Sequence, residues 1–347
     1  ELHITSTDFK DLVNIKDADG KVTVAAGLGN DLKASTSGTG DIVLTAPIIN
    51  QYGKIDSSRD VTLTAEATSK KVDDPDCNAD LLKQMNITSS DTVEAAISQN
   101  GTITARGNGN VTMTATAYKV MRIEDAYKMD SRTTQTKAVI DVNGTVTGYD
   151  VKIAASAKNI FADGLTSEDV GTDVDLTLNL VGILLPNINA DTAILGGDAE
   201  VNIGKDATVE ATANKDNTYT VPKMVDGQAT TETIVQPALD LSAESTLGLT
   251  IGASTTPLKL ADIVHTSAVP SAAVTFAKTD NKATVSVAGT LKSGAGTSIT
   301  AHANSEVNAD ATNTTTDVSA DPEKFNFALL GVESTNYAKV DIASTAK

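Results

Sequence analysis

Residues 100–117 read NGTITARGNGNVTMTATA. A glycine turn opens the stretch, a short β-branched run follows, RGNGN turns the chain, and apolar residues then alternate with threonine from Val111 to Ala117. Because strand side chains point alternately to two faces, Ile103, Ala105 and the apolar positions after them share an interior face. The stretch therefore predicts two short strands that meet at a corner opened by Gly101.

The same pattern recurs along the chain. Copies lie at residues 53–67, 95–117, 138–157, 193–213 and 283–303, with a degenerate copy near 239–254. The leading glycines are 48, 43, 53 and 92 residues apart, at Gly53, Gly101, Gly144, Gly197 and Gly289. Self-similarity at this spacing indicates a repeat architecture. We expect each repeat to hold two or more turns of chain, of about 20 to 25 residues each, plus a loop.

The copies keep small apolar residues on one face and polar residues on the other. The apolar sets are Val61, Leu63 and Ala65; Val111, Met113, Ala115 and Ala117; Val151, Ile153 and Ala155; and Ile299, Ala301 and Ala303. Aromatic residues make up only 3% of the chain, whereas propeller blades usually carry periodic aromatics. We therefore predict an all-β fold, a right-handed parallel β-helix (β-solenoid) with irregular loop insertions. A propeller or a sandwich is the alternative.

Residues 1–347 are expected to form a single elongated β-solenoid segment of a longer chain. The first residues, ELHITSTD, alternate like a strand already under way and show no signal peptide. Three stretches break the repeat and predict loop insertions at about 66–94, 118–137 and 214–237. Loops on a rigid scaffold are the usual place for recognition, so these form either a contact surface or tolerated decoration.

Two segments resemble a known family. AILGGDAEVNIGKDATVEATA (193–213) and NGTITARGNGNVTMTATA (100–117) look like the repeats of large bacterial exoproteins. These are the filamentous-haemagglutinin-like and leukotoxin-like proteins of two-partner and autotransporter secretion. The resemblance covers about residues 40–345. It implies a right-handed β-helix stalk that is exported through an outer-membrane pore and serves adhesion, biofilm formation or self-association.

Charge and cysteine content exclude several classes of function. The net charge of −18 and the pI of about 4.5 repel nucleic acid phosphates and anionic lipid surfaces. No apolar run approaches the roughly 18 residues of a transmembrane helix, the longest being LVGILL at 180–185. Cys77 is the only cysteine, which excludes an internal disulfide and is compatible with either the cytosol or a bacterial cell surface.

One acidic segment is a weak Ca²⁺ candidate. Oxygen ligands alternate in DPDCNAD, at Asp74, Asp76, Asn78 and Asp80. An EF-hand loop would need Gly where Ala79 stands and Glu where Met85 stands, so that motif is not met. A solvated acidic loop is the alternative. Another acidic turn, KDADGK at residues 16–21, predicts a hairpin or a corner.

No catalytic motif is present: G-x-S-x-G, H-E-x-x-H and P-loop patterns are all missing, and we expect His302 to face solvent. β-Helical polysaccharide lyases and hydrolases are the enzymatic alternative, since they share the fold; Glu200 and Glu210 are the strand carboxylates that such a site would use. Thr-x-Thr pairs such as Thr62 and Thr64 also resemble ice-binding solenoids, although the outward positions change to Lys152 and Glu210 further along.

The sequence thus predicts a non-enzymatic extracellular protein on a bacterial cell surface, a rigid stalk for cell adhesion, biofilm matrix or filament self-assembly. No catalytic or cofactor-binding residue is predicted. Its partners would be other cells, host or matrix surfaces, or copies of itself joined end to end or laterally, with no nucleic acid and no membrane insertion. Unpaired strand edges at open coil ends would permit such assembly.

Overall fold

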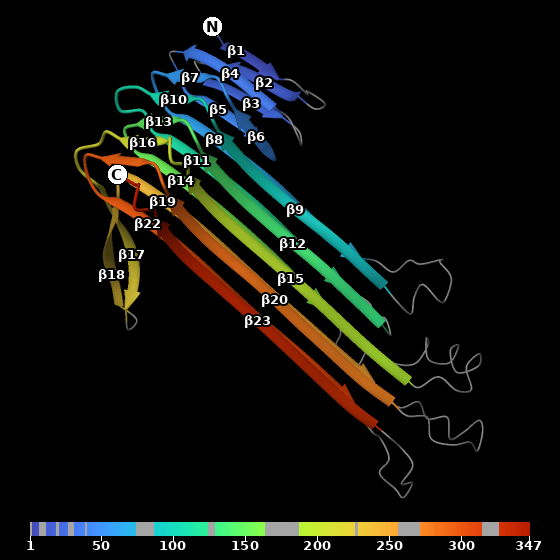
Figure 1. Ribbon diagram of the computed structural model, residues 1–347. Helices are drawn as coiled ribbons and strands as arrows, with labels where there is room; N and C mark the ends of the chain where they lie inside the picture. The colour runs from blue at the N-terminus through green and yellow to red at the C-terminus, as the bar shows by residue number, and fades with distance from the viewer. Residues whose placement is uncertain are drawn as a thin grey trace, which may run out of the picture.

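The computed structural model describes residues 2–6, 12–18, 21–26, 31–38, 40–73, 87–123, 129–163, 187–225, 228–255, 271–313 and 326–347. Within these ranges all regular secondary structure is β-strand. No helix in them is long and apolar enough to cross a membrane. Figure 1 shows the strands stacked side by side from the N-terminal to the C-terminal end, which is the predicted parallel β-helix.

Successive coils place one strand on each of three faces. Face A holds β6 (Ile48–Gln51), β9 (Ile87–Gln99), β12 (Met129–Val142), β15 (Asn187–Ile203), β20 (Ser271–Val287) and β23 (Asn326–Ile342). The corner face holds β4 (Asp31–Gly38), β7 (Lys54–Ser57), β10 (Thr102–Ala105), β13 (Thr145–Gly148), β16 (Thr208–Ala211) and β21 (Thr290–Ser293). Face B holds β3 (Lys21–Ala26), β5 (Ile42–Ala46), β8 (Val61–Asp73), β11 (Val111–Ile123), β14 (Val151–Asp163), β19 (Leu239–Thr255) and β22 (Thr297–Asn313).

Four strands lie outside this pattern. β1 (Leu2–Ser6) pairs antiparallel with β4, and β2 (Leu12–Ala18) pairs antiparallel with β3. Ala18 lies opposite Lys21 in that second pair, so the KDADGK segment joins a hairpin, as predicted. β17 (Asn217–Val225) and β18 (Gln228–Gln236) form a separate antiparallel hairpin. Figure 1 shows this hairpin projecting from the corner region of the solenoid.

Equivalent apolar side chains stack from coil to coil inside the solenoid. On face B, Val61 pairs with Val111, Val111 with Val151, and Val151 with Leu239, and all four side chains are buried. The predicted interior sets of the first three copies are buried as expected, and so are Ile103 and Ala105. Successive coils therefore pack with the same small residues, because each interior side chain contacts an equivalent apolar side chain in the next coil.

The expected number of turns per repeat is wrong. Val61, Val111, Val151, Leu239 and Thr297 occupy the same column of face B, so each sequence repeat is one coil and not two or more. The long strands explain the difference. β8, β11 and β14 have 13 residues each and β19 and β22 have 17, which takes up the length that a second turn was expected to fill.

One predicted corner glycine is also misplaced. Gly53, Gly101 and Gly144 follow one another at the corner, and an added Cβ at Gly101 would collide with the Gly53 carbonyl oxygen. In the next coil the corner position belongs to Gly204, not Gly197. Gly197 lies inside β15, where a Cβ would come within 2.6 Å of the Ser245 hydroxyl oxygen. The sequence pattern could not separate the two, because both glycines precede a β-branched run.

The strands extend into the ranges expected to be loops. Face B strands continue to Asp73 and Ile123, and face A strands begin again at Ile87 and Met129, because pairing between neighbouring coils continues there. Residues 74–86 and 124–128 lie outside the described residues. The third expected insertion, 214–237, contains the β17–β18 hairpin.

A layer of buried polar residues divides the interior. Near the corner the core consists of apolar residues such as Val151, Ile153 and Val201. Further along the strands a second apolar cluster forms around Phe161, Leu195 and Leu247. Between the two clusters lie the buried polar side chains Asn159, Thr134, Thr136, Ser245, Thr279 and Asn281.

Hydrogen bonds satisfy much of this polar layer, but among the described residues the Ser245 hydroxyl and Asn281 Oδ1 have no hydrogen-bond partner. The Asn159 amide nitrogen donates to the Thr134 carbonyl (3.1 Å) and to the Gly196 carbonyl (3.0 Å), which links face B to two strands of face A. The Asn281 amide nitrogen donates to the carbonyls of Ser245 (3.1 Å) and Asn304 (2.8 Å). Amide side chains thus hold faces A and B together where the apolar core is interrupted.

Candidate functional site

The outer side of face A carries most of the ion pairs that the described strands make with one another. Glu94, Lys137, Asp198 and Lys282 are neighbours in one row across β9, β12, β15 and β20, so their charges alternate. Lys137 Nζ lies 3.4 Å from the Glu94 carboxylate. Parallel in-register stacking brings these residues together from distant parts of the sequence.

A three-residue cluster of Asp198, Glu200 and Lys282 is the most enclosed part of this surface. Asp198 and Glu200 are two residues apart on β15 and therefore point to the same side. Lys282 on β20 donates a hydrogen bond to the Glu200 carboxylate and lies 3.6 Å from Asp198 Oδ1. Both carboxylate side chains are 22% exposed and the lysine is 41% exposed. The cluster is a charged site that is partly shielded from water.

The pKa values of the two carboxylates in the cluster are shifted in opposite directions. Burial and the neighbouring charge of Glu200 raise the pKa of Asp198. Burial also acts to raise the pKa of Glu200, but its hydrogen bond with Lys282 and the lysine charge outweigh that effect and lower it. Glu200 in turn raises the pKa of Lys282. Two adjacent carboxylates with divergent pKa values are a common arrangement for acid and base pairs, and ion-pair networks of structural proteins produce the same divergence.

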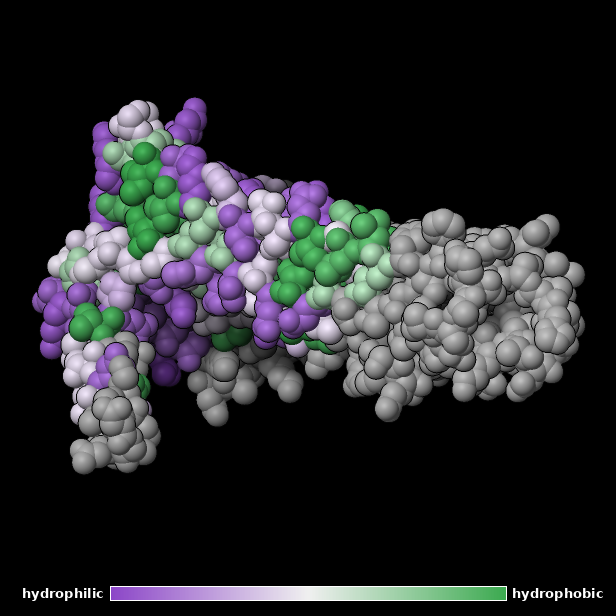
Figure 2. Space-filling model, turned by 90° about the horizontal axis from the view of Figure 1, so that it is seen from below, coloured by the Kyte–Doolittle hydropathy of each residue, from purple (hydrophilic) through white to green (hydrophobic). Residues whose placement is uncertain are grey.

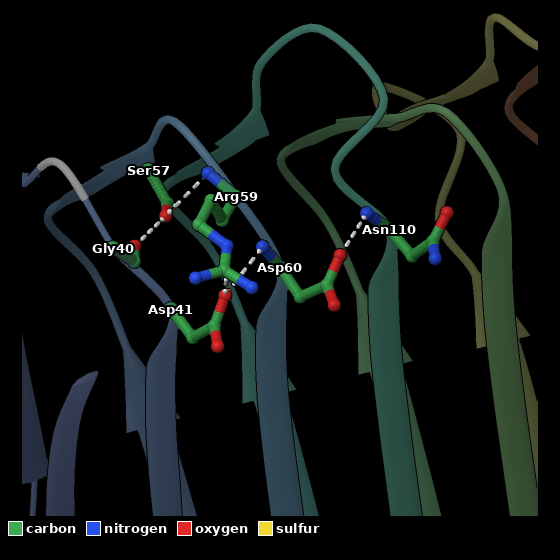
Figure 3. A network of polar contacts seen from close by, with 6 residues as sticks. All are labelled: Gly40, Asp41, Ser57, Arg59, Asp60 and Asn110. Carbon is green, nitrogen blue, oxygen red and sulfur yellow. Dashed lines mark hydrogen bonds and ion pairs between the residues drawn. The ribbon is translucent and has the colours of Figure 1, made fainter. Parts of the chain in front are cut away.

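A second polar network follows the corner that precedes face B (Figure 3). Asp41 Oδ1 accepts a hydrogen bond from the backbone amide of Asp60 (3.3 Å), and Asp60 Oδ1 accepts one from the backbone amide of Asn110 (2.7 Å). Asn110 Oδ1 accepts one in turn from the backbone amide of Asp150 (3.1 Å). Each side chain therefore binds the next coil at the same position, and we call this series the corner ladder.

The corner ladder continues past the inserted hairpin because a residue outside the usual ladder position supplies the acceptor. Where the preceding coils have Asp, Asn and Asp, the next coil has Ala238, which has no acceptor in its side chain. Asp216, just before the hairpin, takes that role: its Oδ1 accepts from the backbone amides of Ala238 (3.3 Å) and Gly296 (2.7 Å). The inserted hairpin is thus compatible with uninterrupted stacking.

A salt bridge on the corner face is close and well oriented. The Arg106 guanidinium donates two hydrogen bonds to Asp56, at 2.6 and 2.5 Å, across one coil, and Lys54 Nζ lies 2.9 Å from the same carboxylate. The bond from Arg106 is the main reason that the pKa of Asp56 lies below its usual value. Its position between stacked coils indicates a structural role.

The sequence candidates are distributed as follows. Asp74, Asp76, Asn78 and Asp80 lie outside the described residues, so the proposed Ca²⁺ loop stays a prediction. Elsewhere, no group of three or more His, Cys, Asp or Glu in the described ranges has an arrangement that could hold a metal ion. Glu210 is half-buried on β16, away from Glu200 on β15, and His302 is exposed as expected. Sequence reasoning singled out Glu200 but missed Asp198 and Lys282.

No family model, curated protein or solved structure matches this chain. The resemblance to bacterial exoprotein repeats, and the secretion and adhesion that it implies, therefore stay predictions. The architecture itself rests on the strand pairings described above.

Proposed function

We propose that this chain is a non-enzymatic extracellular scaffold, a stiff β-helix segment of a bacterial surface or matrix protein. The main support is the uninterrupted in-register pairing of β5, β8, β11, β14, β19 and β22. Such stacking makes a solenoid in which every internal strand is paired on both edges, so the molecule resists bending and holds surface elements at fixed spacing. Contacts of low individual affinity then add up through multivalency.

The β17–β18 hairpin is the described element best placed for such contacts. Its two strands pair with each other and with no other described strand. Thr218, Thr220, Thr231 and Thr233 are exposed on it, and so is Val235. We propose that this hairpin contacts other cells or matrix surfaces while the solenoid holds it in place.

Binding of beads coated with the protein to cell monolayers and to immobilised matrix proteins tests this role. The matched control replaces Thr218 through Val235 with two glycines, which keeps Asp216 and its hydrogen bonds to the corner ladder. We expect this variant to keep the β-sheet circular dichroism spectrum of the unaltered chain and to lose at least half of the bead binding. Bead binding by the unaltered chain that never exceeds that of uncoated beads would contradict the scaffold role.

A polysaccharide-active enzyme is the second candidate, and the Asp198–Glu200–Lys282 cluster is the observation that favours it. A carboxylate pair with opposed pKa directions on the outer side of a β-helix suits glycosidic bond cleavage. Incubation with acidic and neutral polysaccharides, with and without Ca²⁺, distinguishes the two. We expect no oligosaccharide release. Release that disappears in Asp198→Asn and Glu200→Gln would overturn the scaffold proposal in favour of catalysis at this cluster.

A further inference from the structure

The β17–β18 hairpin has two outer edges, because its strands pair with each other and with no other described strand. Val225 lies opposite Gln228, so two residues join the strands. In a hairpin with a two-residue loop the closing pair exchanges both backbone hydrogen bonds, and bonded and non-bonded pairs then alternate along the strands. Residues of the non-bonded pairs direct their backbone N–H and C=O groups away from the partner strand. These residues therefore form the outer edges.

Counting back from the loop assigns the outward residues of each strand. On β18 they include Thr231, Thr233 and Val235, and on β17 the residues opposite them are Pro222, Thr220 and Thr218. Pro222 fits this assignment, because a residue without an N–H cannot donate in a bonded pair. The register of the hairpin thus fixes which backbone groups are available for a further strand on either side.

The two edges differ in whether a further strand can pair with them. Pro222 interrupts the β17 edge, since it has no N–H to donate and its ring occupies that position. Lys223 follows it in the sequence, and proline and lysine are residues with which natural proteins protect exposed edges. β18 contains neither residue type. An incoming strand thus meets an interrupted row of backbone groups on β17 and a complete row on β18.

The described side chains of β18 suit strand pairing. Thr231, Thr233 and Val235 are all exposed, Val235 to 56%. All three are β-branched, and such residues favour strands and contribute to cross-strand pairs. A two-stranded hairpin by itself is only marginally stable, so a third strand would stabilise it. Figure 1 shows the hairpin projecting from the stacked coils, so the third strand would extend this small sheet and not the solenoid.

Charge indicates the kind of strand that fits this edge. The chain has a net charge of −18. β18 contains one carboxylate, Glu232, and no lysine or arginine. Figure 2 shows hydrophobic residues in separate patches among polar residues on the face seen from below, so a partner meets a largely polar surface. A positively charged segment is attracted by the field of the whole chain, and a lysine or arginine opposite Glu232 forms a favourable cross-strand pair.

A second copy of this chain is a poorer match for the edge. It carries the same negative net charge. Glu232 is the central residue of the nine in β18, so antiparallel pairing of two β18 strands over their full length would place Glu232 of one copy opposite Glu232 of the other. Like charges directly opposite each other destabilise a strand pair. The charges therefore favour a segment of a different polypeptide.

We propose that the outer edge of β18 binds an extended, positively charged polypeptide segment by β-strand addition, and that Pro222 closes the outer edge of β17 to such a segment. This inference rests on the proposed role of the hairpin as a contact element, and it adds the edge that makes the contact and the class of partner. Main-chain hydrogen bonds supply the affinity, and the charge of Glu232 supplies the preference for a basic segment.

Binding of a synthetic peptide to the full chain tests this proposal. The probe is a fluorescent eight-residue peptide that alternates threonine and lysine and has both ends blocked. A comparison peptide has glutamate in place of lysine. Fluorescence anisotropy measures the affinity, and titration calorimetry measures the number of peptides bound per chain. We expect one lysine peptide per chain, and binding of the glutamate peptide that is weaker by about tenfold or more.

Two proline substitutions separate the edges. Thr233→Pro removes an outward N–H from the β18 edge, and Thr220→Pro makes the same change in the residue directly opposite, on the β17 edge. Both residues belong to a non-bonded pair, so both variants keep the hydrogen bonds within the hairpin, as Pro222 does. We expect Thr233→Pro to weaken binding of the lysine peptide by about tenfold or more and Thr220→Pro to leave it unchanged.

A gain of binding provides the complementary test. Pro222→Thr combined with Lys223→Glu completes the row of N–H groups on the β17 edge and gives that strand a carboxylate, as β18 has. We expect this double variant to bind two lysine peptides per chain. Because binding increases in this variant, a disturbed hairpin cannot account for the result.

Four results would overturn the proposal: no binding of the lysine peptide, equal binding of the two peptides, equal affinities of the two proline variants, or one peptide per chain in the double variant. A dimer that light scattering detects without peptide, and that Thr233→Pro abolishes, would overturn it in favour of a second copy. A chain that binds no peptide but still attaches beads to cells through the hairpin contradicts this inference and leaves the scaffold role intact. Peptide binding without bead binding contradicts the scaffold role alone.

Discussion

Asp60 Oδ1 accepts a hydrogen bond from the backbone amide of Asn110, fifty residues further along the chain, at 2.7 Å. Asn110 then does the same for the backbone amide of Asp150. The relationship ties the start of one face B strand to the start of the next, just before the columns of valines begin. It holds the coils in register by polar contacts at the corner and by apolar packing inside.

Replacing Asp60 with alanine should weaken this corner. The variant loses the acceptor for the Asn110 amide, and a hydrogen bond of this kind contributes about 1 kcal/mol to the free energy of unfolding. Urea denaturation followed by circular dichroism measures the change. Asp60→Asn keeps an oxygen acceptor and should lose less than half as much. Equal losses in the two variants would mean that charge, not the ladder hydrogen bond, matters at this position.

Gly101→Ala should be among the most destabilising single changes in the chain. The new methyl group would collide with the Gly53 carbonyl oxygen, so neighbouring coils must separate, at a cost of about 2 kcal/mol or more. Gly107 provides the comparison. It has a φ of +63° and nothing within 4 Å of an added Cβ, so Gly107→Ala should cost only about 1 kcal/mol of backbone strain. Thermal melting of both variants shows which one loses more stability. A larger loss in Gly107→Ala would mean that the corner accommodates a methyl group at residue 101 without strain.

Asp198→Asn should raise stability at neutral pH. Because the pKa of Asp198 is higher in the folded chain than its usual value of 3.8, the folded state binds the proton more tightly. Its contribution is complete below that value and is lost as the pH rises through the folded pKa. A neutral amide avoids this loss, so we expect a gain of about 0.5 kcal/mol at pH 7 that shrinks towards pH 3. Denaturation at both pH values checks it.

Glu200→Gln should act in the opposite direction. The pKa of Glu200 is lowered in the folded chain, so its stabilising contribution is present above 4.5 and is lost as the pH falls through the folded pKa. The variant also removes the negative charge beside Lys282, while the glutamine amide oxygen can still accept the lysine hydrogen bond. We expect a loss of about 0.5 kcal/mol at pH 7 and convergence with the unaltered chain in acid. Changes of the same sign in Asp198→Asn and Glu200→Gln would contradict the split between the two carboxylates.

Asn159→Leu tests the buried polar layer. The change removes the amide that donates to the Thr134 and Gly196 carbonyls, at a cost of about 1 kcal/mol for each lost hydrogen bond. Ser156→Ala, on the outer side of the same strand, is the control and should cost less than about 0.5 kcal/mol. Chemical denaturation of the two proteins gives the comparison. An unchanged free energy of unfolding in Asn159→Leu would mean that the apolar core could continue through this layer without the hydrogen bonds.

Much of the fold could be predicted because its signals are local. The alternation of Val111, Met113 and Ala115 with threonines assigns a face to each side chain without reference to any other part of the chain. Gly101 and Gly144 likewise mark corners by their own sequence context. The coil count failed because strand length depends on pairing with the neighbouring coil, which a repeat pattern does not contain.

The candidate site could be predicted only in part. Glu200 stands out as a carboxylate on a strand, but its partner Lys282 is 82 residues away. Which residue of a later coil comes to lie beside Glu200 depends on the residues between them, including an inserted hairpin and a segment outside the described residues. Asp198, two residues before Glu200, carried a usable signal, since strand geometry places both on one side.

The sequence by itself determined the strands, their inner and outer faces, most of the glycine corners and the small-residue core, because these follow from periodicity and backbone sterics over a few residues. Tertiary structure alone decided that each repeat is one coil, that Gly204 and not Gly197 forms a corner, and that Asp198, Glu200 and Lys282 meet. These features depend on the register between coils, which is set by pairing over 40 to 88 residues of chain.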